Sequence, residues 1–189
     1  MEKALVNQTN ILRSLPQSLK VALLMVLGSL IIAVSAKIQI PFWPVPMTMQ
    51  TFVVMMIALG FGWKLGGATM LLYLFEGAVG LPVFAKGSGI SYMVGPTGGY
   101  LVGMLVASVV AGYIAQKGFT HKISKSFVPL LIGTSIIFLT GVGYLASFVG
   151  LNKAIALGLT PFLLSESFKI LLAAFLFPQL WKFSRKFKS

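Results

Sequence analysis

Hydrophobic residues in this chain come in long blocks, which short polar or proline-rich stretches separate. Most blocks reach about 15 residues or more, the scale of a membrane-spanning helix, and none shows the strict alternation of a membrane β-barrel. The pattern predicts an all-α integral membrane protein, one membrane domain over residues 1–189 with six transmembrane helices. We expect the spans at residues 19–40, 48–61, 65–80, 98–116, 127–149 and 160–181.

Composition agrees with this class. The chain is 57% hydrophobic and 10% charged, with a mean hydropathy of +0.94, whereas soluble domains carry about 25% charged residues. The absence of cysteine excludes disulfides, thiolate metal sites and a cysteine nucleophile. The one histidine, His121, lies among lysines in a polar connection, where we expect a solvated loop residue. We expect no cofactor and no metal.

The basic residues predict the orientation. Those on the side of the two termini are Lys3, Arg13, Lys20, Lys64, Lys117, Lys122, Lys125, Lys182, Arg185, Lys186 and Lys188, and those on the other side are Lys37, Lys86 and Lys153. By the positive-inside rule both termini are cytoplasmic. Membrane orientation also explains the net charge of +12 better than a nucleic-acid partner does. The three remaining connections should meet on the outer face.

Each outer connection has its own character. Three prolines within residues 41–46 favour an extended segment, in which Phe42 and Trp43 are either interfacial anchors or the lid of a pocket. Residues 151–158 read as a short linker, and Thr160 with Pro161 suits the first turn of the last span.

Gln50, near the start of the second span, should face the bundle because lipid would be costly for it.

Glycine-rich residues 95–103 open the fourth span. Thr97 is a reasonable N-cap, and the amides of Gly98, Gly99 and Tyr100 would then be free to bind an anion or a carbonyl oxygen. The other interpretation is that these glycines serve only turns and packing. Small residues recur every fourth position and predict a face for close helix packing: Gly99, Gly103, Ala107, Ala111 and Ala115.

Glu166 and Lys169 lie inside the last span, about 60° apart on one helical face, and can pair. Glu166 should sit roughly 8 Å below the outer end of its helix. Charges at this depth usually mark a site, although a pair that merely locks helices remains an alternative. Glu76 is either a pocket residue or an interfacial one, solvated or paired with Lys37 or Lys86.

This inventory suits an amide-rich or ureido-like ligand. A carboxylate accepts N–H bonds and an ammonium donates to a carbonyl, while apolar walls would come from Phe42, Trp43, Phe84, Tyr92 and Tyr100. The sequence contains no phosphate-binding loop and no His-Glu-x-x-His motif. We therefore expect no enzyme and no ATP hydrolysis by this chain, so that active transport would need an ion gradient or a partner.

Three segments, in this order and spacing, resemble the BioY family, the biotin-specific substrate-binding subunits (S components) of energy-coupling factor (ECF) transporters. They are Val45-Pro46-Met47-Thr48-Met49-Gln50-Thr51, Tyr73-Leu74-Phe75-Glu76-Gly77-Ala78-Val79-Gly80-Leu81-Pro82-Val83-Phe84 and Gly95-Pro96-Thr97-Gly98-Gly99-Tyr100-Leu101-Val102-Gly103. The resemblance implies a six-helix S-component bundle in a prokaryotic cell membrane. Its high-affinity biotin pocket would lie on the outer side, closed by the loop after the first helix and the long loop after the third.

The resemblance also implies partners and residue roles. The partners are a transmembrane coupling subunit and two cytoplasmic ATPase subunits, contacted by small residues of the first helix, here Ser29 and Ala33. The family's acid and following lysine match Glu166 and Lys169, although the family commonly has aspartate at the first position. Our candidate ligand-binding residues are Glu166, Lys169, Gln50, Trp43, Phe84, Tyr92, Gly98, Gly99, Tyr100 and Glu76.

We therefore expect capture and uptake of biotin, with biotin as substrate. A stand-alone carrier driven by a gradient, through protonation of Glu76 or Glu166, stays open as an alternative. A small intramembrane enzyme or a structural protein fits less well, because the sequence offers no evident base or nucleophile.

Overall fold

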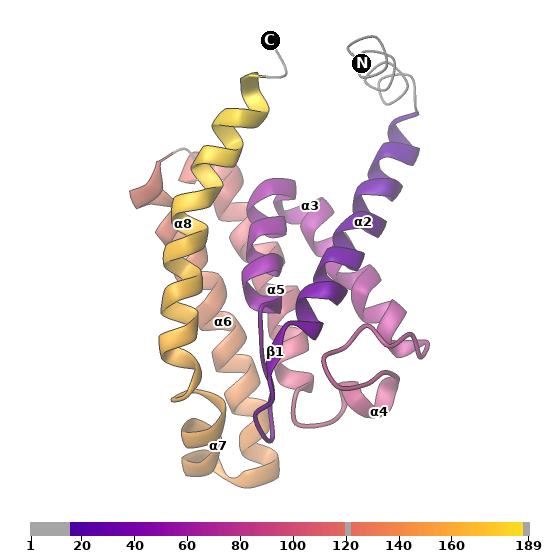
Figure 1. Cartoon of the computed structure of the whole chain (residues 1–189), viewed down its shortest axis with the longest axis vertical. Coiled ribbons are helices and arrows are strands. Elements are labelled where there is room, and N and C mark those ends of the chain that lie inside the picture. Colours follow the sequence, from indigo (N-terminus) through magenta and orange to yellow (C-terminus); the bar gives the residue numbers. More distant parts are fainter. Residues whose placement is uncertain (1–15, 120–121, 187–189) are drawn as a thin grey trace.

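The described residues are mostly helical, as expected, and they include one short two-stranded hairpin (Figure 1). The computed structural model describes residues 16–119 and 122–186, so the expectations for the first fifteen residues and for His121 lie outside it. Its helices are α2 (Gln17–Lys37), α3 (Gln50–Ala78), α4 (Ile90–Met93), α5 (Gly98–Ile114), α6 (Ile123–Val149), α7 (Leu151–Gly158) and α8 (Phe162–Lys186). A π-helical turn, η1 (Ala115–Phe119), continues α5, and β1 (Gln39–Ile40) pairs antiparallel with β2 (Met47–Thr48).

Five of the described helices are long and apolar enough to cross a membrane: α2, α3, α5 with η1, α6 and α8. α3 contains two of the expected spans, because Gly62 interrupts it with φ 74° and ψ 178°. Beyond this glycine the chain doubles back. A Cβ on Gly66 would lie 3.2 Å from the Cα of Ala58, whereas residues eight apart in a straight helix are about 12 Å apart.

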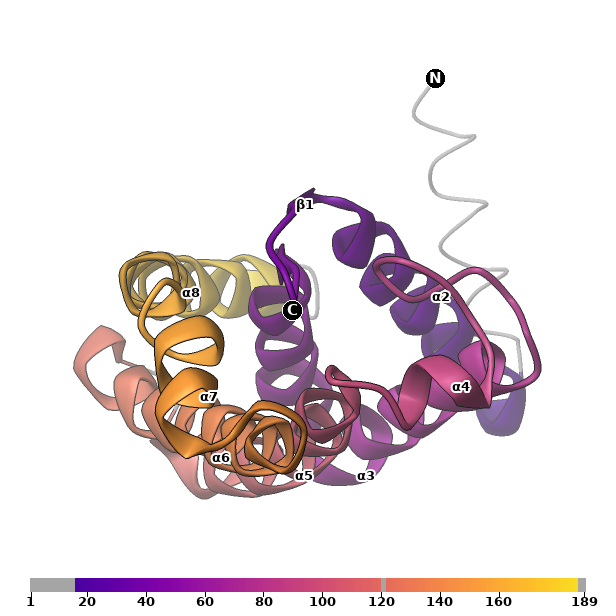
Figure 2. The same cartoon turned by 90° about the horizontal axis from the view of Figure 1, so that it is seen from below.

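The predicted small face of α5 is confirmed. All five of its members are buried, and α5 packs against both α3 and α6. A Cβ on Gly103 would lie 2.9 Å from the Cα of Ile137 in α6, so only a residue without a side chain allows this approach. In Figure 2 these helices lie side by side, with α8 and α2 toward opposite sides.

Two connections differ from expectation. Residues 151–158 form the helix α7 rather than a linker, since Gly150, at φ 80°, turns the chain sharply after α6 and the hydroxyl of Tyr100 donates to the carbonyl of Gly158 at 2.8 Å. The hydroxyl of Thr160 donates to the carbonyl of Ile155. The backbone carbonyl of Thr160 accepts a hydrogen bond from the amide of Leu163 at 3.4 Å, and α8 begins at Phe162, two residues after the predicted N-cap.

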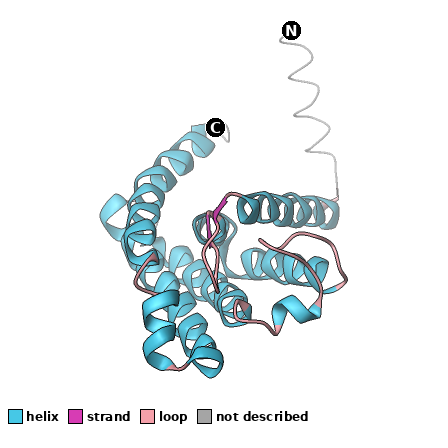
Figure 3. Cartoon of the chain, turned by 60° about the horizontal axis from the view of Figure 1, so that its bottom comes forward, coloured by secondary structure: helices cyan, strands magenta, loops and turns pink. Residues whose placement is uncertain are grey.

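The outer connections do gather at one end of the bundle. The hairpin, α4 and α7 lie at the bottom of Figure 1, whereas α2 begins and α8 ends at the top. We call the end with the hairpin, residues 79–97 and α7 the loop end. Figure 3, with this end turned forward, shows the loop before α4 beside α2.

Candidate ligand-binding site

One cavity opens at the loop end and measures about 510 Å³, the open space at its mouth included. Its walls come from the hairpin, the segment around α4, and helices α3, α5, α6 and α8. The lining residues are Val45, Pro46, Thr48, Gln50, Thr51, Phe84, Ala85, Tyr92, Thr97, Tyr100, Leu101, Met104, Ile137, Phe138, Phe162 and Glu166. Most are apolar, as in typical small-molecule sites.

Aromatic rings form two walls of this cavity. On one side Phe84 stacks on Tyr92 with ring centroids 5.1 Å apart and meets Tyr73 edge-on at 5.5 Å. Gly77 makes this possible, because a Cβ there would overlap the Phe84 ring. On the other side Phe138 contacts both Tyr100 and Phe162, with centroids 6.1 and 6.0 Å apart. Three predicted wall residues, Phe84, Tyr92 and Tyr100, are thus brought together.

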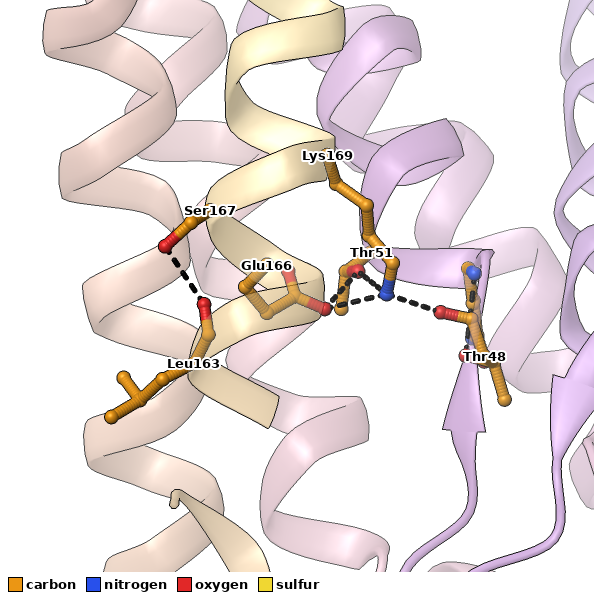
Figure 4. A network of polar contacts seen from close by, with 7 residues as sticks. Thr48, Thr51, Leu163, Glu166, Ser167 and Lys169 are labelled. Carbon is orange, nitrogen blue, oxygen red and sulfur yellow. Dashed lines mark hydrogen bonds and ion pairs between the residues drawn. The ribbon is translucent and has the colours of Figure 1, made fainter. Parts of the chain in front are cut away.

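A buried polar network closes the floor of the cavity (Figure 4). The ammonium of Lys169 lies 2.6 Å from Oε1 of Glu166. It also donates to the carbonyl of Thr48 at 2.6 Å and to the hydroxyl of Thr51 at 3.2 Å. The Thr51 hydroxyl in turn donates to the same Glu166 oxygen at 2.9 Å. The predicted pairing of Glu166 with Lys169 is confirmed.

The network divides the roles of the two charged residues. Glu166 and Lys169 are only 5% and 4% exposed, and a lysine ammonium has three hydrogens, which these three acceptors engage. Lys169 lines a second, smaller hollow beneath the floor, together with Met55 and Thr134, whereas Glu166 borders both hollows. In this arrangement Glu166 borders the cavity. Lys169 does not, and instead it holds Glu166 and the residues around the start of α3 in place.

Gln50 faces the bundle, as predicted. Its side chain is 3% exposed and lines the cavity. Its amide nitrogen, Nε2, is buried and makes no hydrogen bond of good geometry with the described residues, although the side chain lies within reach of the Tyr73 hydroxyl. Because an unpaired buried donor is costly, this nitrogen is a candidate to bind a carbonyl oxygen of a ligand.

The glycine-rich stretch is arranged differently from the prediction. The Thr97 side chain makes no capping hydrogen bond. The amides of Gly98 and Tyr100 donate to the carbonyls of Gly95 and Thr97, at 2.9 and 3.1 Å, so two of the three expected free amides are engaged. Side chains at Gly98 and Gly99 would overlap Met93 and Tyr144, and both glycines line a separate hollow beside Tyr144. Close packing therefore accounts for the two glycines.

Trp43 and Glu76 also lie elsewhere than the pocket interpretation places them. Trp43 is 75% exposed at the turn of the hairpin. Glu76 accepts a hydrogen bond from Ser29 of α2 at 2.9 Å, while its other oxygen is buried with no partner among the described residues. Of the alternatives for Glu76, pairing with Lys37 or Lys86 is wrong, because these lysines instead donate to the backbone carbonyls of Phe84 and Phe42.

The predicted role of Ser29 in partner binding also does not match its place in the structure. Its side chain is fully buried against α3 and bonded to Glu76, so it is an internal contact and not available to a partner in this conformation. Ala33, its expected companion, is half-buried.

Sequence reasoning missed several lining residues. Thr51 stands next to Gln50 in a motif that we had singled out, but its role requires α8 to lie against α3. Phe138, Phe162 and Met104 belong to apolar stretches, and nothing in those stretches distinguishes a cavity wall from ordinary packing. Outside the membrane spans, burial raises the pKa of the Tyr92 phenol above its ordinary value of 10.

Comparisons with known proteins agree on one family. A sequence model of the BioY family matches residues 7–186. A probable biotin transporter BioY of Pyrococcus horikoshii is 40% identical over 72% of this chain and 81% of its own length. The biotin transporter BioY of Thermotoga maritima is 40% identical over 76% and 85%. In fold, the chain is similar to the crystal structure of an S-component for biotin from an ECF-type ABC transporter. The TM-score is 0.77 at 24% identity, over 88% of this chain and 93% of the other.

Proposed function

The chain belongs to the BioY family, and from this premise we propose that it binds biotin and takes it up across the membrane as the S component of an ECF-type transporter. Relatives named as biotin transporters support the substrate. A fold shared with an S-component for biotin supports the type of subunit.

The chemistry of the cavity carries this proposal. Biotin has a ureido ring with two N–H donors and one carbonyl acceptor, fused to an apolar sulfur-containing ring. Glu166 at the cavity floor supplies an acceptor, and the unpaired nitrogen of Gln50 supplies a donor. The rings of Phe84, Tyr92 and Phe138 supply apolar walls. Specificity follows, because a ligand without a ureido group offers no N–H donor to Glu166 and no carbonyl to the Gln50 nitrogen.

We infer that α3 crosses the membrane twice, giving six spans with the loop end outside and both termini in the cytoplasm of a prokaryotic cell. The turn at Gly62 supports two crossings. The positive-inside rule supports the orientation: Lys20, Lys64, Lys117, Lys122 and Lys125 belong to element ends away from the loop end, whereas Lys37, Lys86 and Lys153 belong to the loop end.

A transmembrane coupling subunit and two ATPase subunits would supply the energy, since the sequence has no phosphate-binding loop. The face of α2 that points away from the bundle suits the membrane partner. Leu27, Ile31 and Val34 are 55%, 54% and 64% exposed there, and half-buried Ala33 lies beside them. This surface replaces the predicted contact through Ser29.

Biotin titration of the purified chain in detergent tests the proposal, with thiamine and riboflavin as controls. We expect tight, selective, stoichiometric binding of biotin by this single chain. Gln50→Leu should weaken binding by about tenfold or more, because a ligand carbonyl loses its donor, while the thermal unfolding midpoint stays the same or rises. A folded chain that ignores biotin would overturn the assignment.

A gradient-driven carrier remains a second candidate, because one oxygen of Glu76 is buried without a partner among the described residues and could take up a proton. Proteoliposomes that contain only this chain separate the two functions. Uptake that survives without partners and collapses with a protonophore would favour the carrier. The S-component proposal expects no ATP-driven accumulation there.

A further inference from the structure

Positive charge gathers at the end of the bundle opposite the loop end, at the top of Figure 1. Exposed lysines there are Lys64 after the turn of α3, Lys117 in η1, and Lys122 and Lys125 around the start of α6. Glu76 and Glu166 bond to other residues, so no carboxylate of the described residues neutralises these lysines. This surface can therefore attract an anion from outside the chain.

Two of these lysines lie over aromatic rings. Nζ of Lys64 is 5.4 Å from the centroid of the Trp63 ring, and Nζ of Lys117 is 5.1 Å from that of Tyr113. Both rings are exposed, Trp63 by 39% and Tyr113 by 51%, as is typical of aromatic residues at the level of lipid headgroups. A cation–π contact supplies no oxygen acceptor, so both ammonium groups keep N–H donors for a phosphate.

Both aromatic–lysine pairs come from one contact, in which the turn of α3 interlocks with the end of α5. A Cβ on Gly112 would lie 2.7 Å from the backbone nitrogen of Trp63, and a Cβ on Gly62 would overlap the side-chain amide of Gln116. Residues without a side chain allow this approach. One lysine directly follows Trp63 and the other directly follows Gln116, so both emerge from this contact.

A hollow opens beside the same contact, among α3, η1 and α8. It measures about 640 Å³, the open space at its mouth included. Its lining residues are Leu59, Gly60, Phe61, Gly62, Ala115, Gln116 and Trp181. Most of these are apolar, whereas the exposed amide of Gln116 lies next to Lys117 in the chain. An apolar hollow with a basic, polar rim matches a lipid, which has an acyl chain and a charged headgroup.

We propose that this hollow, with Lys64 and Lys117 at its rim, binds an anionic phospholipid of the adjacent leaflet. The acyl chain lies along the hollow and the phosphate accepts from the two ammonium groups. Basic pockets between membrane helices hold anionic headgroups in this way. The site shares no lining residue with the ligand cavity, so the inference goes beyond the proposed function and does not depend on it. The bound lipid would tie the turn of α3 to η1 and α8.

Tryptophan fluorescence measures this binding, because Trp63 and Trp181 belong to the site. Trp43→Phe removes the third tryptophan of the chain, at the loop end. Quenching by dibrominated phosphatidylglycerol mixed with phosphatidylcholine, and by the reverse labelling, gives the relative binding constant of the two lipids. We expect phosphatidylglycerol to bind at least fivefold more tightly at low ionic strength.

Lys64→Gln with Lys117→Gln, in the same background, should reduce this preference to less than twofold. Equal binding of the two lipids by the chain with native lysines would overturn the proposal. An acidic segment of a partner subunit would then be the occupant to test on this surface.

A matched control separates a defined site from the general attraction of a basic surface. Lys122→Gln with Lys125→Gln removes the same charge from the same end of the bundle, but away from the hollow. This variant should keep at least half of the preference for phosphatidylglycerol. Equal losses in the two double variants would contradict the site and leave only diffuse attraction.

Gly60→Leu tests the hollow without changing the charge. A Cβ there would lie 3.6 Å from Cε2 of Phe177, an ordinary contact, so the position accepts a side chain. The leucine would take up space in the hollow, and a lipid excluded from it cannot bring its phosphate to the lysines. We expect the preference to fall at least threefold while the thermal unfolding midpoint stays the same. An unchanged preference would contradict the proposed lipid site.

Discussion

Two glutamates lie within the apolar part of this bundle, and their surroundings differ. Glu166 in α8 shares one oxygen between the ammonium of Lys169 and the hydroxyl of Thr51. Glu76 in α3 accepts only the hydroxyl of Ser29 among the described residues, and no described lysine reaches it. The first acid is part of an ion pair within α8, and the hydroxyl of Thr51 bonds this pair to α3 beside the cavity. The second lies where α2 packs against α3, and the hydroxyl of Ser29 is its one hydrogen-bond donor among the described residues.

This difference separates a region held by a charged network from one held mainly by the packing of small side chains. At the floor, breaking the network would leave a charge buried without its partner, which is strongly unfavourable. At the joint between α2 and α3, the contact consists mainly of small side chains, whose separation in lipid exposes no charge pair. The comparison teaches that charged contacts hold the floor of the cavity, whereas the packing of small side chains holds α2 against α3.

Lys169→Met should have the largest effect. It leaves Glu166 buried without a cation, at a cost of about 3–5 kcal/mol in the free energy of unfolding. Biotin binding should be lost or strongly weakened because the floor no longer holds its shape. Thermal unfolding in detergent and a biotin titration measure the two effects.

The double variant Glu166→Gln with Lys169→Met is the matched control, since it removes the unpaired charge. It should regain much of the lost stability without regaining biotin affinity. Near-normal affinity of Lys169→Met alone would instead remove Lys169 from the site.

Thr51→Val should have a smaller effect at the same floor. The valine cannot donate to Glu166 or accept from Lys169, and the loss of a hydroxyl that pairs with buried charges costs about 1–3 kcal/mol. We expect a lower thermal midpoint and weaker biotin binding, with rescue by Thr51→Ser. Equal behaviour of the valine and serine variants would show that the hydroxyl does not support the floor.

Ser29→Ala should have the smallest effect and so test the other half of the comparison. Glu76 loses one hydrogen bond, worth about 1 kcal/mol, and the small strip of α2 keeps its packing. Equilibrium affinity for biotin should stay within twofold of wild type in a titration. A loss of affinity like that of Lys169→Met would mean that the two acids are not distinct in role.

The sequence predicted what depends on local spacing. Glu166 and Lys169 are three residues apart, so helical geometry alone indicated their pairing, and the fourth-residue repeat of α5 indicated its packing face. The polarity of Gln50 was enough to predict that its side chain faces the bundle.

Contacts between distant segments could not be predicted in this way. Ser29 meets Glu76 across 47 positions, and Thr51 meets Glu166 across 115. Such partners depend on which helices pack together, which no local pattern states. Gly98 and Gly99 show the converse, because glycine suits both an anion site and close packing, and only the neighbouring Met93 and Tyr144 distinguish the two.

The floor of the cavity also bears on the order in which the protein is made. Thr48 and Thr51 precede Glu166 and Lys169 by more than a hundred positions, so a ribosome releases the α3 half of the network long before the α8 half. Glu166 and Lys169 lie one helical turn apart and can enter the bilayer already neutralised by each other. The binding site then comes into being only when the last helix docks, and a nascent chain that stops before α8 is without ligand-binding capacity.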